Sequence, residues 1–230
     1  GYPADPYTTM GTIPRITWDL ADAENTNVFY RKLKNSEYFE GFSSNFLWGI
    51  VANAVADIED GSTVGVAGFG AAGSPVELVH ALIEHGASDL TVVNNNAGNG
   101  EVGLAALIAS GQVAKIICSY PRSSGSVVFP DLFKAGKIDL EVVPQGTLAE
   151  RLRAAGAGIP AFYTPTSVGT PLAEGKEVRE FNGKYYVLEY CLPTDIALVK
   201  ADIADTHGNL TYNMTARNFA PVMCMAAKIT

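Results

Sequence analysis

Between residues 62 and 155, short continuous apolar runs alternate with segments whose apolar positions have helical spacing. The runs predict strands, at 62–67, 90–93, 114–119 and 140–143. The spaced segments predict helices, at 50–58, 75–85, 101–110, 130–135 and 147–155. Continuous apolar strands that alternate with helices are typical of a parallel sheet covered on both faces. We therefore expect an α/β fold, an open and mostly parallel sheet with helices on both faces.

The last third of the chain is less regular. Residues 156–166 predict a loop rich in Gly and Pro, and 181–190 predict a hairpin that turns at Asn182-Gly183. Residues 196–201 predict one more strand, and a final apolar run begins at 228–230. These elements complete the expected domain.

The first 45 residues differ from the remainder in composition. They are polar, rich in aromatic residues and weakly periodic. Because so many aromatic side chains need a surface to cover them, we expect an extension over residues 1–45 that wraps a surface or a second polypeptide. The main domain is then expected to span residues 46–230.

Composition narrows the classes of function. The 230 residues carry a formal net charge of −8 and no cluster of Lys and Arg, which argues against a nucleic-acid partner. No apolar run has membrane-spanning length, so we expect a cytoplasmic protein with no membrane partner. The three Cys and three His residues are widely scattered. We expect no metal site and no disulfide framework.

One junction in the chain has the chemistry of an anion site. Residues 68–73 read Gly-Phe-Gly-Ala-Ala-Gly and join a predicted strand to the helix that Pro75 opens. Backbone N–H groups at such a junction can bind an anion or a developing oxyanion. The same letters match the dinucleotide fingerprint G-x-G-x-x-G, but the next strand ends in asparagines at 94–96 rather than in an acidic residue. An NAD-dependent oxidoreductase is thus an alternative that lacks its acidic residue.

The predicted topology indicates where a ligand would bind. In open parallel sheets, ligands lie beyond the carboxyl ends of the strands. By this rule we expect four loops to lie together at the carboxyl edge of the sheet, at 68–73, 94–96, 119–122 and 144–146.

Several segments together resemble the alpha subunit of family I CoA-transferases, of the succinyl-CoA:3-oxoacid type. Ala67 stands where the family has the first glycine of Gly-Gly-Phe. The resemblance covers about residues 50–230, in the family's order. Its segments are 60–75, 93–98, Pro-Gln-Gly-Thr-Leu-Ala-Glu-Arg at 144–151, 156–166, 179–183 and Ala-Arg-Asn-Phe at 216–219. Within the family, residues 94–100 and 118–122 are most similar to the 3-oxoadipate CoA-transferases.

The resemblance implies a CoA-transferase (NagB/RpiA-like) fold and a reaction that moves CoA from succinyl-CoA to a 3-oxoacid, such as 3-oxoadipate in aromatic catabolism. It also implies a glutamyl-CoA intermediate on a beta subunit, whose nucleophile lies in a Ser-Glu-Asn-Gly motif that this chain lacks. The chain would then be half of an enzyme, in a heterotetramer, with coenzyme A as a substrate and no cofactor. It also implies a further strand after 228–230. An acetoacetate or short-chain acid transferase and a non-catalytic binding protein remain alternatives.

The resemblance also implies site residues. Gln145 would donate a hydrogen bond beside the partner's glutamate, while Asn95 and Asn96 would hold the acyl carboxylate. Backbone of the acyl pocket would come from Gly68, Phe69, Gly70 and Gly73. The structural alternatives are that the asparagines form a turn and that Gln145 caps a helix.

A dicarboxylic substrate needs a cation for its far carboxylate. Arg122, in the loop after the third predicted strand, is our first hypothesis for this cation, and Arg217 is the second. An ion pair at a surface or an interface is the alternative for either side chain.

Overall fold

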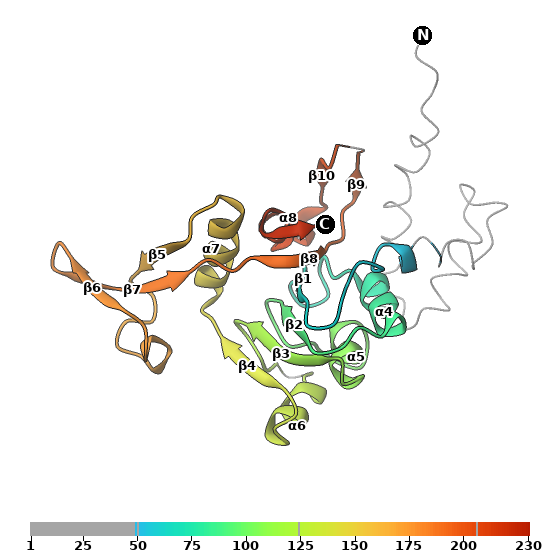
Figure 1. Ribbon diagram of the computed structural model, residues 1–230, viewed down its shortest axis with the longest axis horizontal. Coiled ribbons are helices and arrows are strands. Elements are labelled where there is room, and N and C mark those ends of the chain that lie inside the picture. Colours follow the sequence, from blue (N-terminus) through green and yellow to red (C-terminus); the bar gives the residue numbers. More distant parts are fainter. Residues whose placement is uncertain (1–48, 50, 124, 206) are drawn as a thin grey trace, which may run out of the picture.

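The computed structural model describes residues 49, 51–123, 125–205 and 207–230, so the expected extension at 1–45 lies outside the described residues (Figure 1). Its centre is a six-stranded sheet in the order β11-β8-β1-β2-β3-β4, in which every neighbouring pair is parallel. The strands are β1 (Thr63–Val66), β2 (Leu90–Val93), β3 (Val113–Cys118), β4 (Asp139–Val142), β8 (Thr194–Leu198) and β11 (Ala227–Ile229). The predicted parallel α/β sheet is confirmed.

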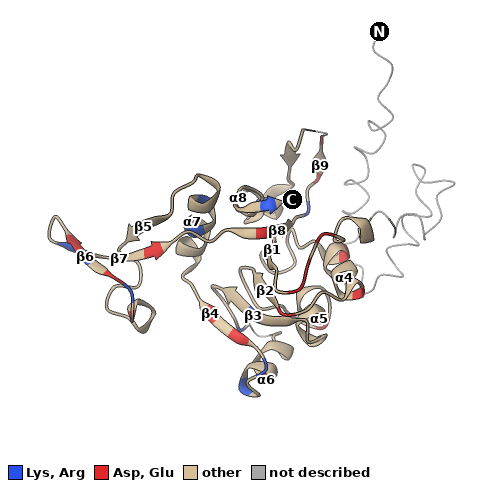
Figure 2. Cartoon of the chain, in the orientation of Figure 1, with Lys and Arg blue, Asp and Glu red and all other residues tan. Residues whose placement is uncertain are grey.

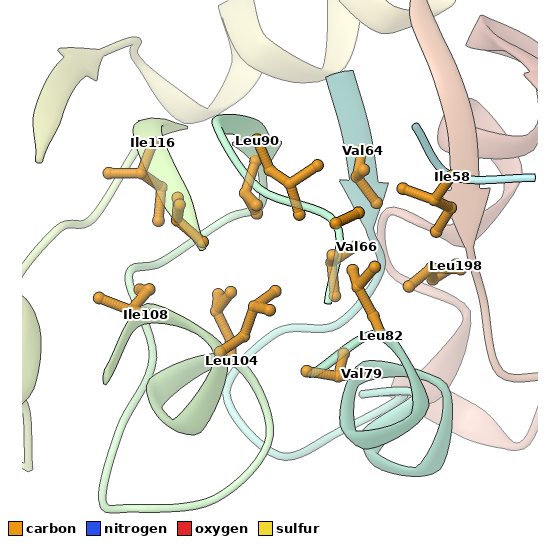
Figure 3. Close-up of a cluster of buried hydrophobic side chains, with 14 of the residues drawn as sticks. Ile58, Val64, Val66, Val79, Leu82, Leu90, Leu104, Ile108, Ile116 and Leu198 are labelled. Atoms are coloured by element: carbon orange, nitrogen blue, oxygen red, sulfur yellow. The ribbon is translucent and has the colours of Figure 1, made fainter. Parts of the chain in front are cut away.

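Helices cover both faces of this sheet. One face packs against α4 (Val76–His85), α5 (Leu104–Ala109) and α6 (Val128–Lys134), and the other against α7 (Gln145–Gly156) and α8 (Ala220–Ala226). Successive strand residues point to opposite faces. Ile116 therefore joins the hydrophobic cluster under α4 and α5, whereas Ile117 joins the cluster under α7 and α8. Figure 3 shows the first cluster, in which Val64 and Val66 of β1 lie near Val79 and Leu82 of α4.

The strand order has a topological switch point beside β1, where the chain changes the side on which it adds strands. From β1 the chain proceeds through β2, β3 and β4 in one direction, and it then returns to add β8 and β11 on the other side of β1. The loops after β1 and β8 consequently leave the sheet at adjacent carboxyl ends. Open α/β sheets bind their ligands at such a point.

A second sheet extends away from this body (Figure 1). It is antiparallel in the order β5-β7-β6, with β5 (Ala161–Thr164), β6 (Val178–Phe181) and β7 (Lys184–Tyr190). The predicted hairpin is confirmed, because Asn182 and Gly183 turn between β6 and β7 with φ of 51° and 77°. Short elements complete the chain: η3 (Pro171–Ala173), β9 (Ile203–Ala204), β10 (Leu210–Thr211) and η4 (Met214–Arg217).

Several predicted bounds are wrong. The helix expected over 50–58 is helical only at 49 and 51–53 in the part that the structure describes, and 54–57 form a turn. The apolar residues of this segment are nevertheless buried, since Val55 and Ile58 are 1% and 2% exposed. The predicted 101–110 helix begins only at Leu104, because Gly103 before it has φ of 57°.

Three further differences concern β5, β8 and the start of α4. The segment 156–166, expected as a loop, contains β5. The strand expected at 196–201 is β8, which begins and ends earlier, at Thr194 and Leu198. Pro75 is the N-cap of α4 rather than its first residue. The shorter β8 matters for function, because it moves residues 199–201 from the strand into a loop at the sheet edge.

Candidate active site

The glycine loop, residues 68–74, joins β1 to α4 and turns tightly on itself. Phe69 and Ala72 exchange backbone hydrogen bonds of 3.0 and 3.2 Å, and Gly70 between them has φ of 61°, where an L side chain is strained. Within the described part of the chain, the N–H groups of Gly70, Ala71 and Gly73 donate to no acceptor. The loop thus presents backbone donors that an anionic ligand could use.

The segment at 214–218 packs against this loop. The side-chain Oδ1 of Asn218 accepts the N–H of Gly68 at 3.2 Å, and its Nδ2 donates to the carbonyl of Ala72 at 2.9 Å. The backbone is so close here that a Cβ on Gly73 would lie 2.4 Å from the carbonyl oxygen of Ala216. Only glycine fits at position 73. Sequence reasoning assigned no role to Asn218, although it lies in the Ala-Arg-Asn-Phe segment.

The asparagine turn, residues 94–98, follows β2. Asn94 donates from Nδ2 to the carbonyl of Val66 at 2.6 Å and accepts the N–H of Asn96 at 2.8 Å. Asn96 in turn accepts the N–H of Gly98 at 2.8 Å. Side-chain acceptors that bond a backbone N–H two residues ahead are the usual way in which asparagine builds a turn. Asn94 and Asn96 therefore shape the backbone that follows β2.

Asn95 joins three loops at the edge of the sheet. The residue is 3% exposed, and its Oδ1 accepts hydrogen bonds of 2.7 Å from the hydroxyl of Ser119 and from Nε2 of Gln145. Ser119 follows β3, and Gln145 begins α7 after β4. The carboxyl ends of β2, β3 and β4 are thus linked by side chains, as the strand pattern predicts.

Gln145 is exposed and is the first residue of α7. Pro144 is the N-cap of this helix, and no side chain caps it, so the alternative that Gln145 is a helix cap is wrong. Its amide nitrogen carries two hydrogens, of which Asn95 uses one. The other hydrogen can be donated to a group placed above the sheet edge.

Two cavities lie around the glycine loop. The larger, of about 240 Å³, lies at the switch point and is lined by Ala71, Ala72, Gly73, Lys200, Ala201, Asp202 and residues 212–216. The smaller, of about 150 Å³, lies between the glycine loop and the asparagine turn and is lined by Gly70, Ala71, Ser74, Val76, Glu77, Asn94, Asn96, Gly98, Asn99, residues 102–104 and Lys200. Ala71 and Lys200 line both.

The predicted site residues separate into two groups. Gly73 lines the larger cavity, and Gly70 and Asn96 line the smaller one. The other predicted residues line neither, and they are Gly68, Phe69, Asn95, Arg122, Gln145 and Arg217. Phe69 is 52% exposed at the tip of the loop, and the side chains of Arg122 and Arg217 are also exposed.

Sequence reasoning missed three charged residues on the cavity walls: Lys200 in both cavities, Glu77 in the smaller and Asp202 in the larger. Burial lowers the pKa of the Lys200 ammonium, and the nearby Glu77 carboxylate opposes this change. Burial raises the pKa of Glu77, which is opposed first by a hydrogen bond from its own backbone and then by Lys200. The sequence did contain a signal for Lys200, a single cation directly after an apolar run. Because the predicted strand at 196–201 included Lys200, the residue was not assigned to a loop at the sheet edge.

None of the described helices has the length and apolar character that a membrane crossing requires. Among the residues that the structure describes, no group of three or more His, Cys, Asp or Glu side chains could hold a metal ion.

Comparison with known proteins gives a consistent picture. Residues 50–230 match the family model described as Coenzyme A transferase. The chain is 61% identical over 178 residues to the A subunit of the 3-oxoadipate CoA-transferase of Pseudomonas putida, and the match covers 77% of each chain. It is 53% identical over 172 residues to the A subunit of the succinyl-CoA:3-ketoacid coenzyme A transferase of Xanthomonas campestris pv. campestris strain B100, with 75% of this chain and 70% of the relative covered.

Among solved structures, the fold is similar to that of an acyl-CoA transferase from Escherichia coli O157:H7 in a thioester complex with CoA. The TM-score is 0.68 at 25% sequence identity, and the match covers 78% of this chain and 42% of the other.

Proposed function

The chain belongs to the coenzyme A transferase family, and we propose that it is the alpha subunit of an enzyme that transfers CoA from succinyl-CoA to 3-oxoadipate. The observation that carries the proposal is the 61% identity to one subunit of a 3-oxoadipate CoA-transferase. Family membership decides against the NAD-dependent oxidoreductase that the glycine loop alone left open.

A second acceptor acid has a specific observation in its favour. The relative named for succinyl-CoA:3-ketoacid transfer is 53% identical to this chain, only a little less than the relative named for 3-oxoadipate. Both names share the 3-oxoacid class. Acetoacetate is therefore the competing acceptor, and the assay below compares the two acids.

We further propose that a beta subunit supplies the nucleophile. Each of the two relatives is named as one subunit of its enzyme, and the 230 residues contain no Ser-Glu-Asn-Gly motif. In the proposed reaction a glutamate of the partner attacks the carbonyl of the acyl-CoA thioester, which expels the CoA thiolate and forms an acyl–glutamyl anhydride. The thiolate then attacks the glutamyl carbonyl, which releases succinate and leaves a glutamyl-CoA thioester. The acceptor carboxylate attacks that thioester, expels the thiolate and forms a second anhydride, and the thiolate attacks its acyl carbonyl to give the new acyl-CoA and the free glutamate; this is covalent catalysis with ping-pong kinetics.

This chain would contribute hydrogen-bond donors to the reaction. Each attack creates a tetrahedral oxyanion, and a preorganised donor to an oxyanion is worth about 3–4 kcal/mol. Gln145 is supported in this role because Asn95 fixes its amide and leaves one N–H available. The glycine loop is supported as the wall of the acyl pocket by its unused N–H groups and by the cavities beside it.

The test is reconstitution. The purified chain is mixed with a candidate beta subunit, and succinyl-CoA consumption is followed with 3-oxoadipate or with acetoacetate as acceptor. We expect activity only from the mixture, with a higher kcat/KM for 3-oxoadipate. CoA transfer by the isolated chain would contradict the partner's role, and a preference for acetoacetate would replace the proposed acceptor.

A further inference from the structure

We propose that Lys200 binds the carboxylate at the far end of the dicarboxylic acyl chain, in the smaller cavity between the glycine loop and the asparagine turn. This inference rests on the proposed function, because succinyl and 3-oxoadipyl groups carry a carboxylate remote from the thioester. A buried or half-buried carboxylate needs a compensating cation.

The position of Lys200 in the fold is the first support. It lies two residues after β8, at the switch point where the loop after β8 faces the loop after β1. Both cavities around the glycine loop include Lys200 in their walls. A ligand that enters from the sheet edge would therefore meet this side chain.

The remaining cations of the described chain are placed elsewhere. Besides Lys200, no described Lys or Arg lines either cavity. Figure 2 shows basic segments mainly on α6, on α7, around β6 and near the C-terminus. Those held in ion pairs are Lys115, Arg151, Arg153, Lys176, Arg179 and Lys228. The others are exposed, namely Arg122, Lys134, Lys137, Lys184 and Arg217.

Polar groups on the opposite walls suit a carboxylate. Gly70 and Ala71 line the smaller cavity and have N–H groups without an acceptor in the described chain. The first turn of α4 contributes Val76 and Glu77 to the same cavity; its N-cap residue Pro75 makes no side-chain hydrogen bond, and the carboxylate of Glu77 bonds to its own backbone there. Such a helix end attracts negative charge. The cavity thus joins one ammonium to several backbone donors.

Glu77 allows a second prediction, in which the affinity for the ligand changes in the opposite direction. Its carboxylate lies on the wall of the smaller cavity and interacts with Lys200, so it competes with a ligand carboxylate for the same positive charge. Removing the charge of Glu77 should therefore strengthen ligand binding, whereas removing the charge of Lys200 should weaken it. A purely structural role of this pair would predict the same direction for both changes.

The experiment measures binding of two small acids by isothermal titration calorimetry. Succinate and butyrate have the same number of carbons, but butyrate lacks the second carboxylate. The full chain is used together with its beta subunit. For Lys200→Met we expect the Kd of succinate to rise about tenfold or more, while the Kd of butyrate changes less than about twofold. Lys200→Arg should retain most of the preference for succinate.

Matched variants complete the design. Glu77→Gln should lower the Kd of succinate, and Lys184→Met, an exposed lysine on β7, should change neither Kd. Arg122→Ala and Arg217→Ala should also leave the preference for succinate intact. Thermal unfolding and co-elution with the beta subunit verify that each variant folds and assembles.

Three results would overturn the proposal: no preference of the wild type for succinate over butyrate, an equal loss of both acids in Lys200→Met, or a selective loss in Arg122→Ala or Arg217→Ala. Turnover of succinyl-CoA by the wild-type complex is measured separately. An inactive complex that still shows the Lys200-dependent preference would reject the proposed function and keep the carboxylate site.

Discussion

At the scale of single residues, the asparagines after β2 have separate tasks. Asn94 and Asn96 bond to nearby backbone groups and so shape the turn. Asn95 instead reaches Ser119 and Gln145, which lie 24 and 50 residues away in the chain. Because Asn95 is buried, this contact fixes the amide of Gln145 on an otherwise exposed helix start.

The Gln145 amide gives the first prediction at this scale. If its free N–H stabilises the oxyanion, Gln145→Ala should lower kcat about 10²–10³-fold with little change in KM, as measured by steady-state kinetics of the reconstituted enzyme. Glu150→Ala, on the exposed side of the same helix, should leave kcat within about twofold. An effect on KM alone would assign Gln145 to substrate binding instead.

At the scale of elements, the glycine loop depends on a segment that is distant in sequence. Asn218 bonds Gly68 across 150 residues and Ala72 across 146 residues. Its amide thereby satisfies the buried N–H of Gly68, a group worth about 1–3 kcal/mol when left without a partner, and adds a second donor to the carbonyl of Ala72, which also accepts the N–H of Phe69. The conformation of the loop after β1 is set by the segment before α8.

Two glycines of this loop form a matched pair for a test of that packing. Gly70→Ala meets no atom within 4 Å and pays only for its φ of 61°, about 1–2 kcal/mol. Gly73→Ala has a similar φ of 70° and also meets the carbonyl of Ala216 at 2.4 Å. We expect Gly73→Ala to lose about 1–3 kcal/mol more of unfolding free energy in urea titrations. An equal loss of unfolding free energy in the two variants would show that the 214–218 segment can move aside at little cost.

At the scale of the whole molecule, two hydrophobic clusters hold one sheet between two layers of helices. The loops of the site all leave this rigid layer at one edge. A single edge therefore collects groups from β1, β2, β3, β4 and β8. Contacts between neighbouring helices, such as α4 and α5, contribute to the stability of the whole unit.

His80 makes one such contact and predicts a pH dependence of global stability. Its Nε2 accepts the N–H of Gly103 at 3.1 Å, which a protonated ring cannot do. Burial lowers the pKa of His80 below the ordinary 6.5, against the opposing charge of Glu84. A pKa that is lower in the folded state gives stability that is complete above pH 6.5 and is lost as the pH falls below that value.

We therefore expect the unfolding free energy from urea titrations to decrease between pH 7.5 and 5.5. His80→Gln should make this decrease smaller. A decrease of the same size in His80→Gln would assign the pH dependence to other groups.

Much of the fold could be predicted because its signals are local. The predicted strand at 90–93 coincides with β2, and the Asn182-Gly183 turn is where the structure has it. The failures have tertiary causes. Val55 and Ile58 have helical spacing, but Val55 is buried from a turn and Ile58 from the residue just after it; β5 forms because β7 offers it a pairing edge.

By itself, the sequence determined the parallel sheet, the order of its elements and the loops that meet at its edge, because periodicity and glycine positions act over a few residues. Only the tertiary structure decided that Asn95 holds Gln145, that Asn218 supports the glycine loop and that Lys200 stands in the walls of both cavities. These contacts join residues far apart in the chain, and their geometry arises only when the sheet brings its carboxyl ends together.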